Sequence, residues 1–210
     1  MKLKRIISLT LVLLSVMCFP TEVLAITSSG SARIQYFSNP GEGMTSSINS
    51  YLDGVGYTST RQGNVSKSTM GNTLSGIHKV VFIKTHGNQS NSRLTCSNGY
   101  LYPSDVSSSN IKFAYLEGCY SSVHATGVTS FRQRMQNLGV PMTVGFMDSV
   151  SYSTQTDGIN YFSYRTFYYL SNGYQLNAAI ISARNNLYSM YNTYYGTDLV
   201  EYTGVFNTLP

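Results

Sequence analysis

Charged side chains are scarce in this sequence: Asp, Glu, Lys and Arg make up only 11% of its 210 residues. Ser, Thr, Asn and many of the 18 Tyr must therefore provide much of the surface that contacts water. Such a composition is common in extracellular proteins. Beyond residue 25 there remain 11 basic and 8 acidic residues, and this small positive excess does not indicate a nucleic-acid partner.

Long apolar runs are also lacking, except at the N-terminus. Three basic residues stand among the first five, an apolar core extends from Ile6 to Phe19, and Val23-Leu24-Ala25 ends the segment with a small residue suited to cleavage. These features predict a signal peptide over residues 1–25 and a mature domain over residues 26–210.

No later stretch reaches the roughly 18 apolar residues that a membrane-spanning helix needs. We therefore expect a secreted, extracellular protein, with or without attachment to the cell surface, and no stable membrane insertion after signal cleavage. A lipoprotein signal that uses Cys18 is the rival interpretation, but Met17 fits poorly before a lipidated cysteine.

Cysteine is rare, and only Cys96 and Cys119 remain once the predicted leader is removed. In an oxidising compartment, the simplest role for such a pair is one disulfide. Two free thiols are the alternative, with Cys96 in a polar loop that no strand positions. The His and Cys spacings do not form a zinc signature, and no glycine-rich phosphate loop is present, so the sequence implies no metal and no cofactor.

Internal repeats and Pro-rich linkers are absent after residue 26, which favours a single domain. Short apolar strands alternate with segments of helical period, the pattern of an α/β fold. Strands are expected near residues 33–37, 57–61, 80–83, 111–116, 142–147 and 199–206. Helices are expected near residues 44–55, 66–74, 128–138, 162–170 and 176–187.

Two reactive side chains each follow a predicted strand. His86 comes directly after the apolar run that begins at Val80, and Cys119 comes after the strand of residues 111–116. Because functional groups gather at the carboxyl ends of parallel strands, we expect both residues at one edge of the sheet. A cysteine thiolate is a nucleophile and an adjacent imidazole can accept and return its proton, so the pair could perform acyl transfer.

Gly87 follows the histidine, and its lack of a Cβ would let a backbone N–H approach a substrate carbonyl. The N–H of Cys119 could be the second donor to the developing oxyanion. Taken alone, His86-Gly87 is more simply the start of a loop that happens to contain a histidine. The second strand that ends in cysteine favours the catalytic interpretation.

At these residues the sequence resembles the caspase-like (clan CD) cysteine peptidases, which include clostripain, gingipains, legumain and metacaspases, and the related CHAT-type domains. Strand-His86-Gly87 and strand-Glu117-Gly118-Cys119-Tyr120-Ser121 match the two catalytic signatures of this family in order. The resemblance extends through the strand that begins at Val140-Pro141 and the helix that follows Gly173-Tyr174, and covers about residues 77–187.

This resemblance implies a three-layer sandwich, in which a mostly parallel sheet of about six strands carries helices on both faces. It also implies that Cys119 is the nucleophile and His86 the general base and acid. The N–H groups of Gly87 and Cys119 would form the oxyanion hole.

Glu117 stands where clostripain-like enzymes and metacaspases carry an aspartate that binds a basic P1 side chain. A carboxylate there could pair with Lys or Arg. Legumain-like enzymes have glutamate at this place and prefer Asn, so both preferences stay open, as does a purely structural role for the acid. Asp148 is a second candidate for substrate binding, and a simple loop acid is the alternative.

The sequence therefore predicts a secreted cysteine endopeptidase that acts on peptide or protein substrates, with Lys or Arg as one candidate P1 residue. A catalytically inactive binding module at the cell surface is an alternative, in which the Tyr-, Asn- and Ser-rich exterior contacts glycan or protein. An acyltransferase or transpeptidase that uses the same dyad is another. The oligomeric state stays open.

Overall fold

The computed structural model describes residues 30–37, 42–123, 126–151, 158–205 and 207–210, so the predicted leader of residues 1–25 lies outside the described residues. A six-stranded sheet has the order β2-β1-β3-β6-β7-β8, and every neighbouring pair is parallel except β7 and β8. Its strands are β1 (Gly30–Tyr36), β2 (Tyr57–Gly63), β3 (Val80–Lys84), β6 (Phe113–Glu117), β7 (Met142–Phe146) and β8 (Val200–Thr203).

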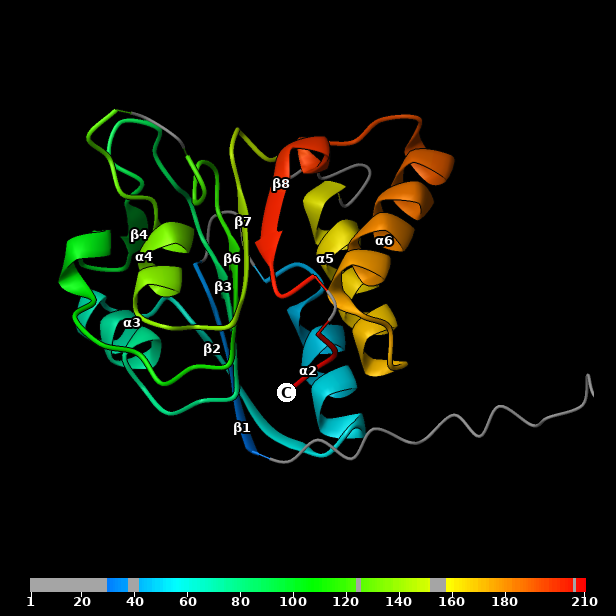
Figure 1. Ribbon diagram of the computed structural model, residues 1–210, viewed down its shortest axis with the longest axis horizontal. Helices are drawn as coiled ribbons and strands as arrows, with labels where there is room; N and C mark the ends of the chain where they lie inside the picture. The colour runs from blue at the N-terminus through cyan, green and yellow to red at the C-terminus, as the bar shows by residue number, and fades with distance from the viewer. Residues whose placement is uncertain (1–29, 38–41, 124–125, 152–157, 206) are drawn as a thin grey trace, which may run out of the picture.

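Helices cover both faces of this sheet (Figure 1). On one face lie α2 (Thr45–Gly54), α5 (Gly158–Ser171) and α6 (Leu176–Tyr191). On the other lie α3 (Lys67–Leu74) and α4 (Phe131–Asn137). The predicted α/β sandwich with about six mostly parallel strands is confirmed.

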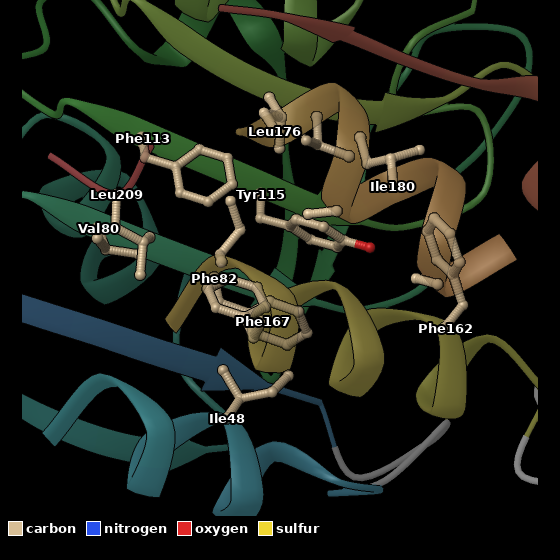
Figure 2. Packing of buried hydrophobic residues seen from close by; sticks show 14 of the residues in the cluster. Ile48, Val80, Phe82, Phe113, Tyr115, Phe162, Phe167, Leu176, Ile180 and Leu209 are labelled. Atoms are coloured by element: carbon tan, nitrogen blue, oxygen red, sulfur yellow. The ribbon is translucent and has the colours of Figure 1, made fainter. Parts of the chain in front are cut away.

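Side-chain alternation along the central strands divides the core into two layers. Val80 and Phe82 of β3 pack toward α5 and α6, whereas Val81 and Ile83 pack toward α3 and α4. In the first layer the rings of Tyr115, Phe82 and Phe167 contact one another, with centroid distances of 5.3 to 5.7 Å (Figure 2). Every residue of β3, β6 and β7 is buried, as expected for strands covered on both faces.

The connection from β3 to β6 differs from the expected polar loop around Cys96. It contains a two-stranded hairpin of β4 (Leu94–Cys96) and β5 (Gly99–Leu101), followed by a 3₁₀ turn at Pro103–Asp105. Cys96 ends β4 and is buried against α3. Strands of three residues are too short to produce a recognisable alternation, and they form here because the hairpin packs on the core.

Several boundaries also shift from the expected ranges, among them the start of α4 and the end of β8. The helix predicted from residue 128 begins at Phe131, because the Ser130 hydroxyl accepts a hydrogen bond from the Gln133 N–H and caps it there. The last strand spans Val200–Thr203, and Phe206, expected within it, lies outside the described residues. A second 3₁₀ turn, Thr197–Leu199, precedes this strand.

A polar network anchors the segment that follows β6. The Arg132 guanidinium of α4 binds a Glu201 carboxylate oxygen of β8 at 2.6 Å and donates from Nε to the Ser122 hydroxyl at 2.5 Å. Ser122 in turn donates to Glu201. The Arg132 side chain is only 11% exposed, so these contacts provide most of its stabilisation.

We expect Glu201→Ala to lower the free energy of unfolding by about 2 kcal/mol, because it leaves a nearly buried guanidinium without its carboxylate. The control is Glu42→Ala, which removes the exposed ion pair with Arg61 and should cost less than about 1 kcal/mol. Urea denaturation measures both. Equal losses in the two variants would contradict a structural role for the network.

Candidate active site

The two predicted reactive residues follow the neighbouring strands β3 and β6. Lys84, the last residue of β3, pairs with Glu117, the last residue of β6. One step further, the Thr85 N–H donates to the Glu117 carbonyl at 3.0 Å. His86 and Cys119 each follow two residues after Lys84 and Glu117, the last pair of this register. Cys119 packs against the core layer on the α5 side of the sheet.

Gly87 lies in direct contact with the backbone of Cys119. A Cβ added at Gly87 would lie 1.7 Å from the Cys119 carbonyl oxygen, so no other residue fits without separating the two strand ends. Gly118 also packs closely, with a Cβ position 3.1 Å from the Thr85 carbonyl oxygen. Within the part of the chain that the structure describes, neither the Gly87 nor the Cys119 N–H donates a hydrogen bond.

The hairpin holds the His86 backbone in place. The Thr95 N–H donates to the His86 carbonyl at 3.0 Å, and the Thr85 hydroxyl donates to the Thr95 carbonyl at 2.7 Å. The His86 side chain is half-buried, and this burial lowers its pKa below the ordinary value of 6.5. The imidazole is therefore neutral at pH 7, the form that can accept a proton. No local pattern of residues indicates that β4 supports His86.

The Cys119 thiol is half-buried and lies against the loop that follows β7. The Val150 N–H donates to its sulfur at 3.4 Å, and the Val150 carbonyl oxygen is 3.7 Å away. The next residue, Tyr120, has a φ of +57° and donates its N–H to the Asp148 carbonyl at 3.2 Å. These contacts fix the direction of the cysteine side chain.

Cys96 cannot pair with Cys119, because the two thiols belong to opposite layers of the core. The Cys96 sulfur lies 3.7 Å from the Met70 sulfur on the α3 side, whereas Cys119 packs against the α5 side. Both cysteines are free, so the disulfide considered from the sequence is not formed. Burial raises the pKa of the Cys96 thiol and keeps it in its unreactive, protonated form.

Glu117, expected to contact substrate, is 1% exposed. It faces Lys84, which is also 1% exposed, and the Ser163 hydroxyl of α5 lies nearby. Burial raises the pKa of Glu117 to about 7, although the Lys84 ammonium acts in the opposite direction. Lys84 is therefore a member of the site that sequence reasoning missed. The sequence feature that could have revealed Lys84 is its position: it is a charged residue that directly follows the apolar run Val80–Ile83.

Asp148, the second expected substrate contact, lies exposed in the loop that follows β7. Its carboxylate accepts a hydrogen bond from the neighbouring Ser149 N–H at 2.6 Å, and its carbonyl holds Tyr120. These contacts of Asp148 thus shape the loop beside Cys119.

The raised pKa of Glu117 predicts a pH dependence of stability. The folded protein keeps the proton up to about pH 7, whereas the unfolded chain releases it near pH 4.5. Between these values the folded state binds more protons, so raising the pH destabilises it, by up to about 3 kcal/mol. In Glu117→Gln this dependence should disappear. Unfolding free energies measured from pH 4 to 8 test this, and a constant difference between the two proteins would contradict it.

Among the described residues, no group of three or more His, Cys, Asp or Glu side chains could hold a metal ion. In the same part of the chain, no helix combines the length and the apolar character needed to cross a membrane. The sequence matches no family model and no curated protein. Comparison with solved structures is more informative.

The chain is similar to the Arg-specific cysteine proteinase gingipain R of Porphyromonas gingivalis, with a TM-score of 0.65 and 11% identity. It is also similar to caspase-1 of Spodoptera frugiperda, with a TM-score of 0.51 and 11% identity. The chain has a caspase-like fold. The match covers 90% of this chain and 92% of the caspase, but 89% of this chain and only 48% of the gingipain.

Separase of Saccharomyces cerevisiae, solved in complex with securin, is also similar in fold, with a TM-score of 0.52 and 16% identity. This match covers 84% of the present chain and 12% of the separase chain. The family resemblance seen in the His86 and Cys119 motifs is thus confirmed at the level of the caspase-like fold. This chain spans about half the length of the gingipain chain. At identities of 11% and 16%, the similarity shows the fold alone and does not show the activity.

Proposed function

We propose that this protein is a cysteine endopeptidase that hydrolyses peptide bonds through Cys119 and His86. The observation that carries the proposal is the contact between the two strand ends, where Lys84 pairs with Glu117 and Gly87 lies against the Cys119 carbonyl. Two residues of complementary chemistry thus follow neighbouring strands whose ends are in contact. No cofactor is needed for this reaction.

In the proposed reaction, the Cys119 sulfur attacks the carbonyl carbon of the substrate. His86 accepts the thiol proton and returns it to the departing amine. The negative charge on the carbonyl oxygen is stabilised by the N–H groups of Gly87 and Cys119, neither of which has an acceptor among the described residues. Water then hydrolyses the thioester, with His86 accepting a proton from the water.

The fold similarity to gingipain R and caspase-1 supports a peptidase, since both are cysteine peptidases. The free state of Cys96 and Cys119 supports it further, because a disulfide would block the nucleophile and favour a binding module. The leader expected over residues 1–25 makes secretion part of the proposal, with peptides or proteins outside the cell as substrates.

Substrate preference is a separate question. The related fold of gingipain R belongs to an Arg-specific enzyme, and the Glu117 carboxylate beside Cys119 would be the group to bind Lys or Arg here. The Lys84 ammonium, however, already faces this carboxylate, and its positive charge would repel the positive charge of a Lys or Arg side chain.

The test is hydrolysis of a peptide library by the purified protein and by Cys119→Ala. We expect cleavage by the first and none by the second. If the two proteins give the same products, or neither gives any, the proposal is wrong.

A further inference from the structure

The layer of α2, α5 and α6 (Figure 1) carries an unbroken line of tyrosine rings. Tyr174, which follows α5, contacts Tyr169 at a centroid distance of 5.0 Å, and Tyr169 contacts Tyr168 at 5.3 Å. Tyr168 in turn contacts Tyr51 of α2 at 5.7 Å. This part of the line therefore joins the end of α5 to α2.

The line then returns to α5 and continues to α6. Tyr51 contacts Tyr164 at 5.6 Å, and Tyr164 contacts Tyr161 at 6.0 Å. Tyr161 contacts Tyr191, at the end of α6, at 5.8 Å. Tyr191 contacts Tyr195 at 6.0 Å. We call the rings from Tyr174 to Tyr195 the tyrosine line.

Solvent reaches these rings. Tyr174 is 43% exposed, and the other members of the tyrosine line are half-buried. A further stacked pair at the end of α6, Tyr188 and Tyr194, is 43% and 38% exposed, with a centroid distance of 4.8 Å. Contiguous apolar surface with polar groups at its edge is typical of a binding site.

A hollow of about 320 Å³ adjoins the tyrosine line and is lined by Tyr161, Asn186, Ser189 and Met190. The Asn186 amide nitrogen donates to the Tyr169 hydroxyl at 3.0 Å. Within the described ranges, the Asn186 amide oxygen accepts no hydrogen bond. The hollow therefore offers a ring and a hydrogen-bond acceptor side by side.

Charge is nearly absent from this surface. Between residues 158 and 196 the only charged residues are Arg165 and Arg184. The Arg165 guanidinium lies 4.4 Å from the centroid of the Tyr168 ring and donates to the Tyr169 hydroxyl at 3.0 Å, so the rings themselves hold it. Such a surface gives little attraction for a polyanion or a polycation.

A sugar ring shares with tyrosine a division into apolar and polar parts. C–H groups cover its faces and hydroxyls surround its edge, whereas a tyrosine has an apolar ring and a polar tip. Proline-rich peptides also stack on aromatic rings, but their prolines have no N–H to donate to the Asn186 oxygen. Sugar hydroxyls both donate and accept. A line of rings also suits a linear polymer better than a single small molecule.

We propose that the tyrosine line binds a linear, uncharged polysaccharide, whose sugar rings stack on successive tyrosines. This binding is separate from peptide hydrolysis and does not depend on it. The line ends at Tyr195, whose carbonyl accepts a hydrogen bond from the Ser151 N–H at 3.3 Å, and the adjacent Val150 contacts the Cys119 sulfur. The polymer would therefore lie close to the proposed nucleophile.

The experiment titrates the protein with cellohexaose, chitohexaose and maltohexaose and with their disaccharides. Calorimetry measures the affinity, and intrinsic fluorescence reports on the tyrosines because the chain has no Trp. We expect one hexasaccharide to bind at least about tenfold more tightly than its disaccharide, since it spans several rings.

Tyr164→Ala removes a ring from the middle of the line and should weaken binding about tenfold. Tyr174→Ala removes an exposed ring at one end, so it should fold normally and weaken binding about threefold. Tyr174→Phe keeps the ring and should keep the affinity. Tyr100→Ala is the matched control, because Tyr100 is 41% exposed but lies on β5, in the hairpin that packs on the other layer.

Three results would overturn the proposal. The first is no binding of any of the three hexasaccharides, and the second is an equal loss of affinity in Tyr100→Ala and Tyr174→Ala. The third is binding of decaproline in place of the sugars, which would assign the tyrosine line to peptides. A dimer that Tyr174→Ala dissociates, with no sugar bound, would assign it to a second copy of the chain.

Discussion

Cys119→Ala is expected to abolish peptide hydrolysis, with a loss of kcat/KM on the order of 10⁴-fold or more, because the variant has no nucleophile. His86→Ala should lose nearly as much, and the double variant little more than either single one. This lack of additivity follows from the two groups acting in one step. Initial rates with a cleaved peptide measure all three losses.

Thiol labelling separates catalysis from folding in this experiment. Iodoacetamide should modify Cys119 rapidly in the folded wild type and slowly in His86→Ala, because the imidazole that accepts the thiol proton is missing. Cys96 should react only after unfolding, since it is buried beneath α3. Cys96→Ala is the matched control and should keep both activity and fast labelling. Labelling of Cys119 that ignores His86→Ala would contradict the dyad.

Gly87→Ala is expected to cause the second large effect. The new methyl group would meet the Cys119 carbonyl oxygen at 1.7 Å, and because that atom is backbone, the ends of β3 and β6 must move apart. We expect a loss of at least about 2 kcal/mol in unfolding free energy. Displacement of the proposed oxyanion donor should lower kcat by about 10²-fold or more.

Gly54→Ala provides the matched control for this change. Gly54 ends α2, and its added Cβ would meet nothing within 4 Å. Alanine should therefore leave activity unchanged and alter stability by no more than about 1 kcal/mol, in the favourable direction. Urea denaturation and steady-state kinetics on both variants make the comparison. Similar behaviour of the two variants would show that the contact at Gly87 is not needed.

Much of the fold followed from local patterns. The apolar run at Val80–Ile83 and the strand before Cys119 could be recognised because strands buried on both faces are continuously apolar. The helix around Leu176 could be recognised from its spacing of 3.6 residues. The hairpin of β4 and β5 could not, because its stability comes from packing on the core and from pairing with His86, both remote from its own sequence.

The candidate site was predictable only in part, for the same reason. His86, Gly87 and Cys119 stood out because they come shortly after the end of a predicted strand. The role of Lys84 did not, since a single lysine at a strand end is usually exposed. Its partner Glu117 lies 33 residues away in sequence, and Asn160 lies 76 residues away, so only the folded chain brings them together.

The sequence by itself determined that two strands are closely followed by His86 and Cys119, because alternation and apolar runs are properties of neighbouring residues. Tertiary structure decided the rest. The register of β3 and β6 aligns Lys84 with Glu117 and presses Gly87 against Cys119. The two faces of the sheet separate Cys96 from Cys119 and keep both thiols free. Pairing and layering depend on contacts between distant segments, and no local pattern of residues encodes them.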